Sequence, residues 1–441
     1  MPLRVAFDIS ELGSDHHRPE NRRGVNRVVE EVGNSLARLV RDKADAVELL
    51  AVGVQSSAAA AAYLDSPRAG LLASAGRLDK PAHRRWTAVE ERSLTLVADT
   101  ANRGLARRAS RWLIARSLPA QRRIASRLRA FDPESVDVFH STAVNPFPAY
   151  VLRARRPACV TTLYDLIPVR RPELVAPASI ANLRAMLATF RREHFGICIS
   201  QHVKDDFCEY LRLDPSHLFV APLAADPTRF HPCTDTAEIA AARQRFLPDA
   251  EQPYFLSLCT VERRKNLLQL IRCFAQLKRE DPAARDTRLV LVGHVLEAAR
   301  QQVEANIAAE KLEGQVILTG YVADGHLAPI YSGALAFVFP SLAEGFGLPP
   351  LEAMQCGVPV ICSDRTSLPE VVGDAGLLFN PDDADTLCAA MSQVLREDTL
   401  RSDLARRGLA RASLFSWERC AQDHLAAYRA AVHLKGDPSS C

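Results

Sequence analysis

Short apolar runs typical of strands alternate with helical stretches along almost the whole chain. Strands rich in β-branched residues that alternate with helices form parallel sheets covered on both faces. The expected strands are 3–7, 47–52, 136–139, 159–163 and 196–199 in a first series, and 254–259, 288–292, 315–319, 336–339, 358–362 and 376–379 in a second. Two such series predict an α/β fold with two Rossmann-like, doubly wound domains.

A proline-rich segment with little periodicity separates the two series near residues 218–250. Such a segment is typical of a crossing between domains, and a chain of 441 residues is long enough for two separate cores. We therefore expect an N-terminal domain over 1–222 and a C-terminal domain over 223–416. A last helix over 417–434 could pack on either of them.

The bulk composition argues against several classes of protein. The formal net charge is only +3, which does not call for a nucleic-acid partner. The 11 cysteines form no CxxC pair and no zinc-ligand cluster, which is typical of reduced thiols in a cytosolic protein. The N-terminus enters a strand directly, without an apolar leader, and no run is long enough to cross a membrane. We expect a cytoplasmic protein that touches a membrane only from that side.

Residues 103–129 form a basic, partly amphipathic stretch that contains Trp112, Leu113 and Ile114. Basic amphipathic segments bind anionic lipid surfaces or anionic acceptors. The alternative is a solvated helix in an arginine-rich chain. The stretch therefore suggests a peripheral contact at the inner face of a membrane.

The segment 339–383 carries the strongest chemical signal. An expected strand ends at Phe339, and the turn Glu344-Gly345-Phe346-Gly347 then leads into a helix. Glycines let backbone N–H groups approach a ligand, and the N-terminus of a helix favours phosphate. In doubly wound folds this position faces the crevice where ligands bind.

Glu344 and Glu352 bracket the turn and the start of the helix. A carboxylate accepts hydrogen bonds from sugar hydroxyls, and it can take two from a vicinal diol. The alternative is that Glu352 complements the helix dipole and that Glu344 is a loop residue. Spacing alone does not decide between these interpretations.

A second constellation, Thr260-Val261-Glu262-Arg263-Arg264-Lys265-Asn266, follows the first strand of the second series. Cations at the end of a strand can hold a diphosphate without a metal ion and stabilise a leaving group. Cations at the start of a helix oppose its dipole, so their presence suggests a nearby anion. The alternative is a solvated basic helix start.

Several segments resemble the retaining glycosyltransferases of the GT-B fold, specifically glycosyltransferase family 4. The matching segments are CTVERRKNL at 259–267, LVLVG at 289–293, VILTGYV at 316–322, PSLAEGFGLPPLEAMQCGVPV at 340–360, SLPEVVGDAGLLFNPDD at 367–383 and LFSWERCAQDHLAAY at 414–428. Looser matches are GVNRVVEEV at 24–32, DVFHS at 137–141, TTLYDLIPVRRPE at 161–173 and SQHVKDDF at 200–207. The resemblance covers most of the chain outside residues 53–130 and implies a donor site in an interdomain cleft.

The resemblance implies a role for each matching position. Glu344 would contact the donor sugar, Glu352 the ribose hydroxyls, and Arg264 with Lys265 the diphosphate. Further donor contacts are implied for Phe346, Gly347 and Leu348 at the sugar and diphosphate, for Tyr321 and Val322 at the base, and for Gly24 from the other domain. The last helix would cross back onto the N-terminal domain.

Other positions depart from the family or stay open. Thr260 stands where many members carry arginine, and Tyr164-Asp165 stands where many have His-Asp. His140 and Asp165 end expected strands, so we predict them in the pocket, His140 in a catalytic role; a satisfied core residue is the alternative for each. Asp382, Asp383 and Asp385 suggest a turn and a helix cap rather than a metal site. We predict neither a metal nor another cofactor.

The resemblance implies transfer of a hexose with retention of configuration, from a nucleotide-sugar donor to a saccharide acceptor. The EGFGLPPLEAM segment looks like that of mannosyltransferases of bacterial surface polysaccharides, such as lipopolysaccharide O-antigen and exopolysaccharide. GDP-mannose is therefore the first expected donor and a lipid-linked saccharide the expected acceptor. The alternatives are a UDP-sugar or GDP-deoxyhexose donor, a phosphorylase or epimerase of the same architecture, and a catalytically silent scaffold.

Overall fold

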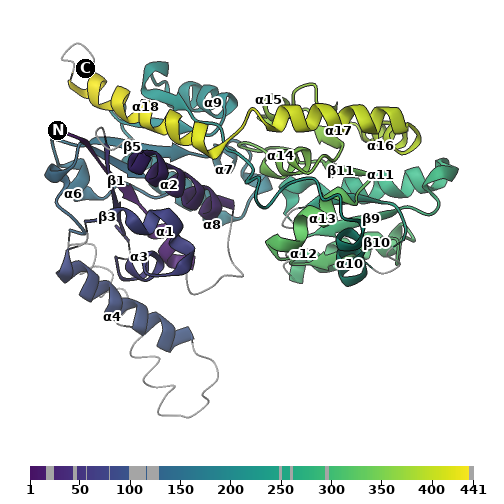
Figure 1. The fold of residues 1–441 in the computed structure, drawn as a ribbon, viewed down its shortest axis with the longest axis horizontal. Coiled ribbons are helices and arrows are strands. Elements are labelled where there is room, and N and C mark those ends of the chain that lie inside the picture. The colour runs from purple at the N-terminus through teal and green to yellow at the C-terminus, as the bar shows by residue number, and fades with distance from the viewer. Residues whose placement is uncertain are drawn as a thin grey trace.

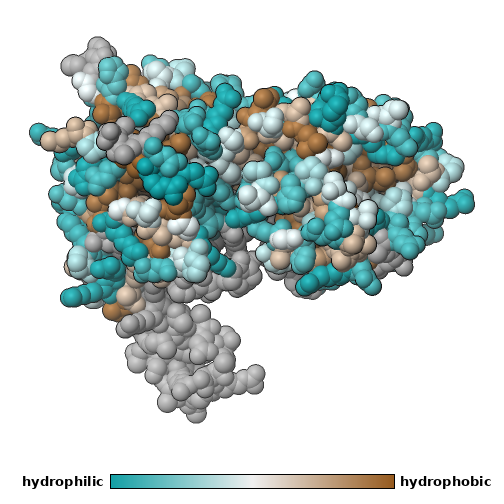
Figure 2. All heavy atoms as spheres, viewed as in Figure 1, coloured by the Kyte–Doolittle hydropathy of each residue, from teal (hydrophilic) through white to brown (hydrophobic). Residues whose placement is uncertain are grey.

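The computed structural model describes residues 1–15, 24–42, 47–55, 57–78, 80–98, 116, 129–247, 251–258, 262–293 and 297–436. Two lobes lie side by side along its long axis (Figure 1). Each lobe is built on one parallel sheet, so the expectation of two doubly wound α/β domains is confirmed. On the face in Figure 2, hydrophilic residues cover most of the surface and hydrophobic residues are scattered between them.

The first sheet has seven strands in the order β3-β2-β1-β4-β5-β6-β7. Its strands are β1 (Leu3–Asp8), β2 (Val47–Val52), β3 (Gly76–Arg77), β4 (Val138–Ser141), β5 (Ala158–Leu163), β6 (Phe195–Cys198) and β7 (Leu218–Val220). Every pairing is parallel, and β1 sets the register with Val5 opposite Leu49 on one side and Val138 on the other. The edge strands β3 and β7 were not predicted, because two or three residues are too few to show a periodicity.

Helices of the first half pack around this sheet (Figure 1). They are α1 (Ser10–Asp15), α2 (Gly24–Asp42), α3 (Ser57–Leu64), α4 (Pro81–Ala98), α6 (Ala149–Leu152), α7 (Ile167–Arg170), α8 (Pro177–Thr189) and α9 (Gln201–Leu211). Helix α2 contacts β2 and α9 contacts β6, whereas α4 extends away from the sheet. Helix α2 buries an apolar face that includes Val28, Val29, Val32 and Leu36 in the main core.

The second sheet has six strands in the order β10-β9-β8-β11-β12-β13, again all parallel. Its strands are β8 (Tyr254–Leu258), β9 (Arg288–Val292), β10 (Val316–Gly320), β11 (Ala336–Phe339), β12 (Val360–Ser363) and β13 (Gly376–Phe379). The helices around it are α10 (Thr236–Phe246), α11 (Leu267–Glu280), α12 (Glu297–Ala309), α13 (Leu327–Ser332), α14 (Leu348–Gln355), α15 (Leu368–Val372), α16 (Ala384–Arg396) and α17 (Asp398–Ala412). Helix α10 lies in the segment expected to be irregular.

The last helix, α18 (Trp417–Gly436), leaves the second lobe and lies against the first. It packs on α2 and on β5, β6 and β7, whereas the preceding helix α17 packs on α14, β12 and β13 (Figure 1). Tyr428 and Ala431 on α18 are fully buried in this contact. The chain therefore crosses between the lobes a second time near its end.

The two lobes exchange hydrogen bonds at the start of α9. The Glu370 carboxylate, in the first turn of α15, accepts from the backbone N–H groups of Gln201 (2.7 Å) and His202 (3.1 Å). The Ser200 hydroxyl accepts from the Val203 N–H (3.1 Å) and donates to the Gly345 carbonyl (2.8 Å). Free N–H groups at a helix start need acceptors, and here one of the acceptors comes from the other lobe.

We predict that Glu370→Ala destabilises the protein by about 1 kcal/mol, the usual cost of losing a cap. The free energy of unfolding in urea measures the loss, and Glu418→Ala, an exposed glutamate on α18, is the control. Equal stability of the Glu370 and Glu418 variants would show that the carboxylate does not hold the lobes together.

Candidate active site

The turn after β11 packs against the first lobe. Gly347 has φ +118° and caps the N-terminus of α14, a conformation that favours glycine. Gly345 lies so close to the first lobe that an added Cβ would stand 2.0 Å from the Tyr164 carbonyl oxygen and 3.2 Å from the Asp165 Cβ. Any side chain at position 345 would push the lobes apart. The packing of the lobes therefore requires Gly345, and the backbone conformation favours glycine at position 347.

Glu344 is the centre of a buried ion cluster at this junction. Its carboxylate contacts the Arg264 guanidinium, and Oε1 lies 2.8 Å from the Lys265 Nζ. Burial alone would raise the pKa of Glu344, but the two cations outweigh it and lower the pKa to about 2. Glu344 is therefore ionised at every physiological pH.

The two cations are fixed by the backbone on which they lie. They belong to a single 3₁₀ turn, η6 (Arg263–Lys265), which Asn266 ends with φ +54° before α11 begins. Arg264 donates to the Ala343 carbonyl (3.0 Å), and Lys265 Nζ lies 4.8 Å from the centre of the Phe339 ring. The sequence suggested an anion beside these cations, and in the structure the carboxylate of Glu344 is such an anion.

Asp165 joins the cluster from the first lobe. It follows β5, is partly buried, and accepts from the Ile167 N–H (3.0 Å). Burial raises the pKa of Asp165, and the nearby Arg264 opposes this rise. The neighbouring Tyr164 is buried, and its hydroxyl donates to the Thr142 carbonyl (2.7 Å). Of this predicted pair, only Asp165 has its ionisable group beside the Glu344 cluster.

Glu352 forms a second ionic contact between the lobes. It lies on α14 with only 5% of its side chain exposed, and its Oε1 accepts from Arg27 Nη1 of α2 at 2.7 Å. The Tyr331 hydroxyl of α13 lies 3.4 Å from Oε2. Burial raises the pKa of Glu352, and Arg27 opposes this rise. The carboxylate predicted to bind ribose is thus covered by an arginine of the other lobe.

The remaining predicted donor contacts lie around these two carboxylates with different exposures. Phe346 is buried against Phe415, with 5.9 Å between ring centres, and Leu348 is half-buried at the start of α14. Gly24 begins α2 and is exposed. After β10, Tyr321 is 61% exposed whereas Val322 is buried. A ligand in this region could reach the ring of Tyr321 directly.

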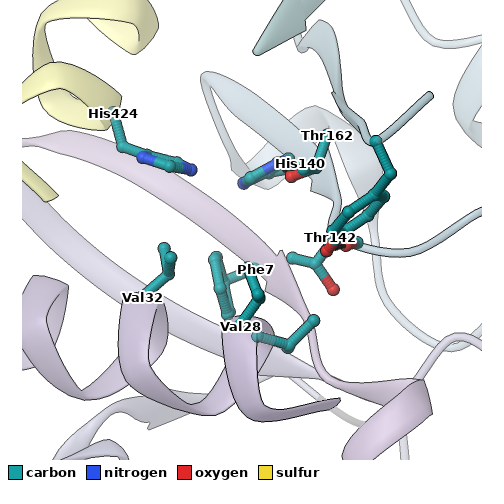
Figure 3. Close-up of a pocket in the computed structure, with 9 residues that line it drawn as sticks. Phe7, Val28, Val32, His140, Thr142, Thr162 and His424 are labelled. Atoms are coloured by element: carbon teal, nitrogen blue, oxygen red, sulfur yellow. Dashed lines mark hydrogen bonds between the residues drawn. The ribbon is translucent and has the colours of Figure 1, made fainter. Parts of the chain in front are cut away.

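His140 lies apart from Glu344, in a buried polar cluster beneath α18. Its Nδ1 is 2.7 Å from the Tyr428 hydroxyl, and its Nε2 is 2.9 Å from the Thr162 hydroxyl. Figure 3 shows its ring facing His424 above Phe7, Val28 and Val32, around a small cavity. In this arrangement both ring nitrogens of His140 have partners inside the protein.

Several residues of this region were not singled out from the sequence. Arg27 was only part of a loosely matching motif, Asp324 had no motif, and Ser200 and Glu370 belonged to matching segments without an assigned role. Thr366 and Ser367 also support the turn: the Thr366 hydroxyl accepts from the Glu344 N–H, and the Ser367 hydroxyl lies 2.9 Å from the Glu344 carbonyl. No spacing in the sequence reveals partners that are this far apart along the chain.

Further expectations can be compared with the described part of the chain. Asp383 caps α16 by accepting from the Asp385 N–H (3.0 Å), so the predicted helix cap is confirmed. The described cysteines are free thiols. Among the described residues, no group of three His, Cys, Asp or Glu side chains is arranged to hold a metal ion, and no helix combines the length and apolarity needed to cross a bilayer. Thr260 and nearly all of the basic stretch 103–129 lie outside the described residues.

Comparisons with known proteins agree with this architecture. Residues 22–229 match the family described as Glycosyltransferase Family 4, and residues 238–411 match the family described as Glycosyl transferases group 1. Sucrose-phosphate synthase from Thermosynechococcus elongatus has the same fold, with a TM-score of 0.63 and 22% identity over 97% of this chain and 98% of that one. Two domains, each built on one parallel sheet, together with this structural similarity define a GT-B glycosyltransferase fold.

Two curated relatives are similar in sequence. O-antigen chain mannosyltransferase B of Escherichia coli is 44% identical over 183 residues, which are 41% of this chain and 46% of that protein. Serotype-specific mannosyltransferase WbdA of Escherichia coli is 34% identical over 275 residues, which are 60% of this chain and 32% of that protein. The match spans less than half the length of either relative. The chain belongs to glycosyltransferase family 4 and is similar to its mannosyltransferases.

The buried histidines predict a pH dependence of stability. Burial lowers the pKa of His424 to about 4 and that of His140 well below its usual value. The folded state therefore binds fewer protons than the unfolded state, whose histidines titrate near pH 6.5. This contribution to stability is complete above about pH 6.5 and is lost as the pH falls towards 4.

We expect the thermal unfolding midpoint to fall between pH 7 and pH 5, and to fall less in His424→Leu than in the wild type. His433→Leu, at the last turn of the same helix, is the control. Identical pH profiles for the wild type and His424→Leu would contradict the assignment of this dependence to the buried cluster.

Proposed function

We propose that this chain is a retaining hexosyltransferase that transfers mannose from GDP-mannose to a growing or lipid-linked saccharide of a bacterial surface polysaccharide. The observation that carries the proposal is the buried ion cluster around Glu344. A carboxylate, an arginine and a lysine converge beside the N-terminus of α14, where a sugar diphosphate would need all three. The similarity to O-antigen mannosyltransferases supports mannose and a polysaccharide acceptor.

In this proposal the donor lies between the lobes. The ribose hydroxyls bind Glu352, the base lies near Tyr321 and Val322, and the donor sugar binds Glu344. Lys265 and Arg264 hold the diphosphate together with the backbone N–H groups at Phe346, Gly347 and Leu348, and Gly24 approaches from the other lobe. These cations would replace a metal ion, so no metal or cofactor is required.

The reaction is proposed as a displacement on one face of the sugar. The bond between the anomeric carbon and the phosphate oxygen breaks, and a bond to the acceptor oxygen forms on the same face, so the configuration is retained. The proton of the acceptor hydroxyl passes to the departing phosphate, whose remaining charge Arg264 and Lys265 disperse. Contact between the lobes excludes water, which would otherwise hydrolyse the donor.

Asp165 is a charged group of the first lobe beside Arg264 and Glu344, and we propose that it contacts the acceptor. Its neighbour Tyr164 would shape the pocket through its backbone, because its carbonyl faces Gly345. His140 would act by supporting the ends of β4 and β5. The basic stretch 103–129 remains the predicted contact with the cytoplasmic face of a membrane.

The donor nucleotide is tested by thermal shift with GDP, UDP, ADP and dTDP, each with and without EDTA. A nucleotide at a hundred times its Kd should add roughly 2.7 kcal/mol of stability. We expect GDP to stabilise the protein selectively, and EDTA to have no effect. Stabilisation by UDP alone would indicate a UDP-sugar donor instead of GDP-mannose. Stabilisation by none of the four would refute the donor site.

The chemistry is tested with Lys265→Ala. We expect the rate of mannosyl transfer to fall about 10²- to 10³-fold, because a charge-stabilising group of the leaving phosphate is lost. The fold should persist, since Arg264 still pairs with Glu344. Arg272→Ala, an exposed cation on α11, is the matched control. Full activity of Lys265→Ala would refute its assigned role.

A further inference from the structure

The contact between Arg27 and Glu352 joins α2 of one lobe to α14 of the other. The Arg27 Nη1–Glu352 Oε1 distance is 2.7 Å, and the second oxygen of the carboxylate faces the Tyr331 hydroxyl at 3.4 Å. Only 5% of the Glu352 side chain and 21% of the Arg27 side chain are exposed. A ligand hydroxyl cannot approach such a covered carboxylate unless the guanidinium moves.

Arg27 has a second acceptor within reach. Its Nη2 lies 3.3 Å from Oδ1 of Asp324, in the turn η8 (Asp324–His326) that follows β10. Asp324 is more exposed than Glu352, with 31% of its side chain accessible. If the guanidinium left Glu352, it would keep an anionic partner and would not become an unpaired buried charge, whose cost would be high. The face of the Phe230 ring, 5.6 Å from the guanidinium, also favours a cation here.

We propose that Arg27 is a gating residue that competes with the ribose diol of the nucleotide for Glu352. This inference rests on the proposed function, in which Glu352 binds ribose. Without a nucleotide, Arg27 occupies Glu352 and links the lobes. When the 2′- and 3′-hydroxyls bind Glu352, the guanidinium moves to Asp324. Part of the binding energy of the diol is therefore used to break an ion pair between the lobes. Arg27 thus couples nucleotide binding to the contact between the lobes.

The proposal concerns the diol alone, so it is tested by comparing GDP with 2′,3′-dideoxy-GDP. Calorimetric titration at pH 8 gives the ratio of the two dissociation constants. UDP and 2′,3′-dideoxy-UDP are titrated in parallel. Arg27→Ala removes the competitor, and Arg38→Ala, an exposed arginine on the same helix, is the matched control. A general loss of stability would weaken the binding of both nucleotides to the same extent and would leave the ratio of their dissociation constants unchanged.

We expect Arg27→Ala to raise the preference for the diol roughly two- to fivefold, the range expected for losing an ion pair with one partly exposed partner. Arg38→Ala should leave the preference unchanged. Asp324→Asn, which removes the alternative partner of the guanidinium, should lower the preference and serves as a second test if Arg27→Ala folds poorly. An unchanged or lower preference in Arg27→Ala would overturn the competition, and so would an unchanged or higher preference in Asp324→Asn.

The wild type and Glu352→Ala separate this inference from the proposed function. If the wild type binds neither GDP nor UDP, or binds the dideoxy forms equally well, Glu352 is not a ribose site and both proposals fail. If the wild type prefers the diol, Glu352→Ala loses this preference and Arg27→Ala does not increase it, the ribose site stands and only the gating role of Arg27 is refuted.

Discussion

The buried pairing of Glu344 with Arg264 and Lys265 is the interaction on which the arrangement of the site depends. A carboxylate at this depth is stable only if cations offset its desolvation, and a cation left alone there would be equally costly. The pairing ties the turn after β11 to the turn before α11. Asp165, beside Arg264, adds the end of β5 from the other lobe. This cluster of charged groups thus brings together three segments that are far apart in the sequence.

Around this cluster each lobe satisfies polar groups of the other. Glu370 accepts from the start of α9, Ser200 donates to the Gly345 carbonyl, and Arg27 pairs with Glu352. A small buried apolar cluster of Ile167, Leu174 and Ala343 also crosses the junction. Residues of both lobes also belong to the main apolar core, and polar contacts at a domain interface permit relative motion of the domains. A site between such lobes can close around a donor and open to release its product.

The two carboxylates of the site have different environments, and this difference suits different tasks. Glu344 is held by two cations that keep its pKa near 2, so it presents a permanent charge where a diphosphate and a sugar would meet. Glu352 has one cation, which belongs to the opposite lobe, and burial raises its pKa. Its environment therefore depends on where the lobes lie. The buried His140, in contrast, has partners for both ring nitrogens and stabilises the first lobe beneath α18.

The sequence by itself determined the class of fold, because strand and helix periodicities are local properties that neighbouring residues display. It also indicated Glu344, Arg264 and Lys265 as candidate site residues, since each follows a strand and the ends of parallel strands meet at one edge of a sheet. Only the tertiary structure decided that Arg27 covers Glu352, 325 positions away, and that Glu370 caps α9. These contacts join separate lobes, and no local pattern encodes how two independently built sheets are placed against each other. The short edge strands and the surroundings of His140 depended on the same long-range packing.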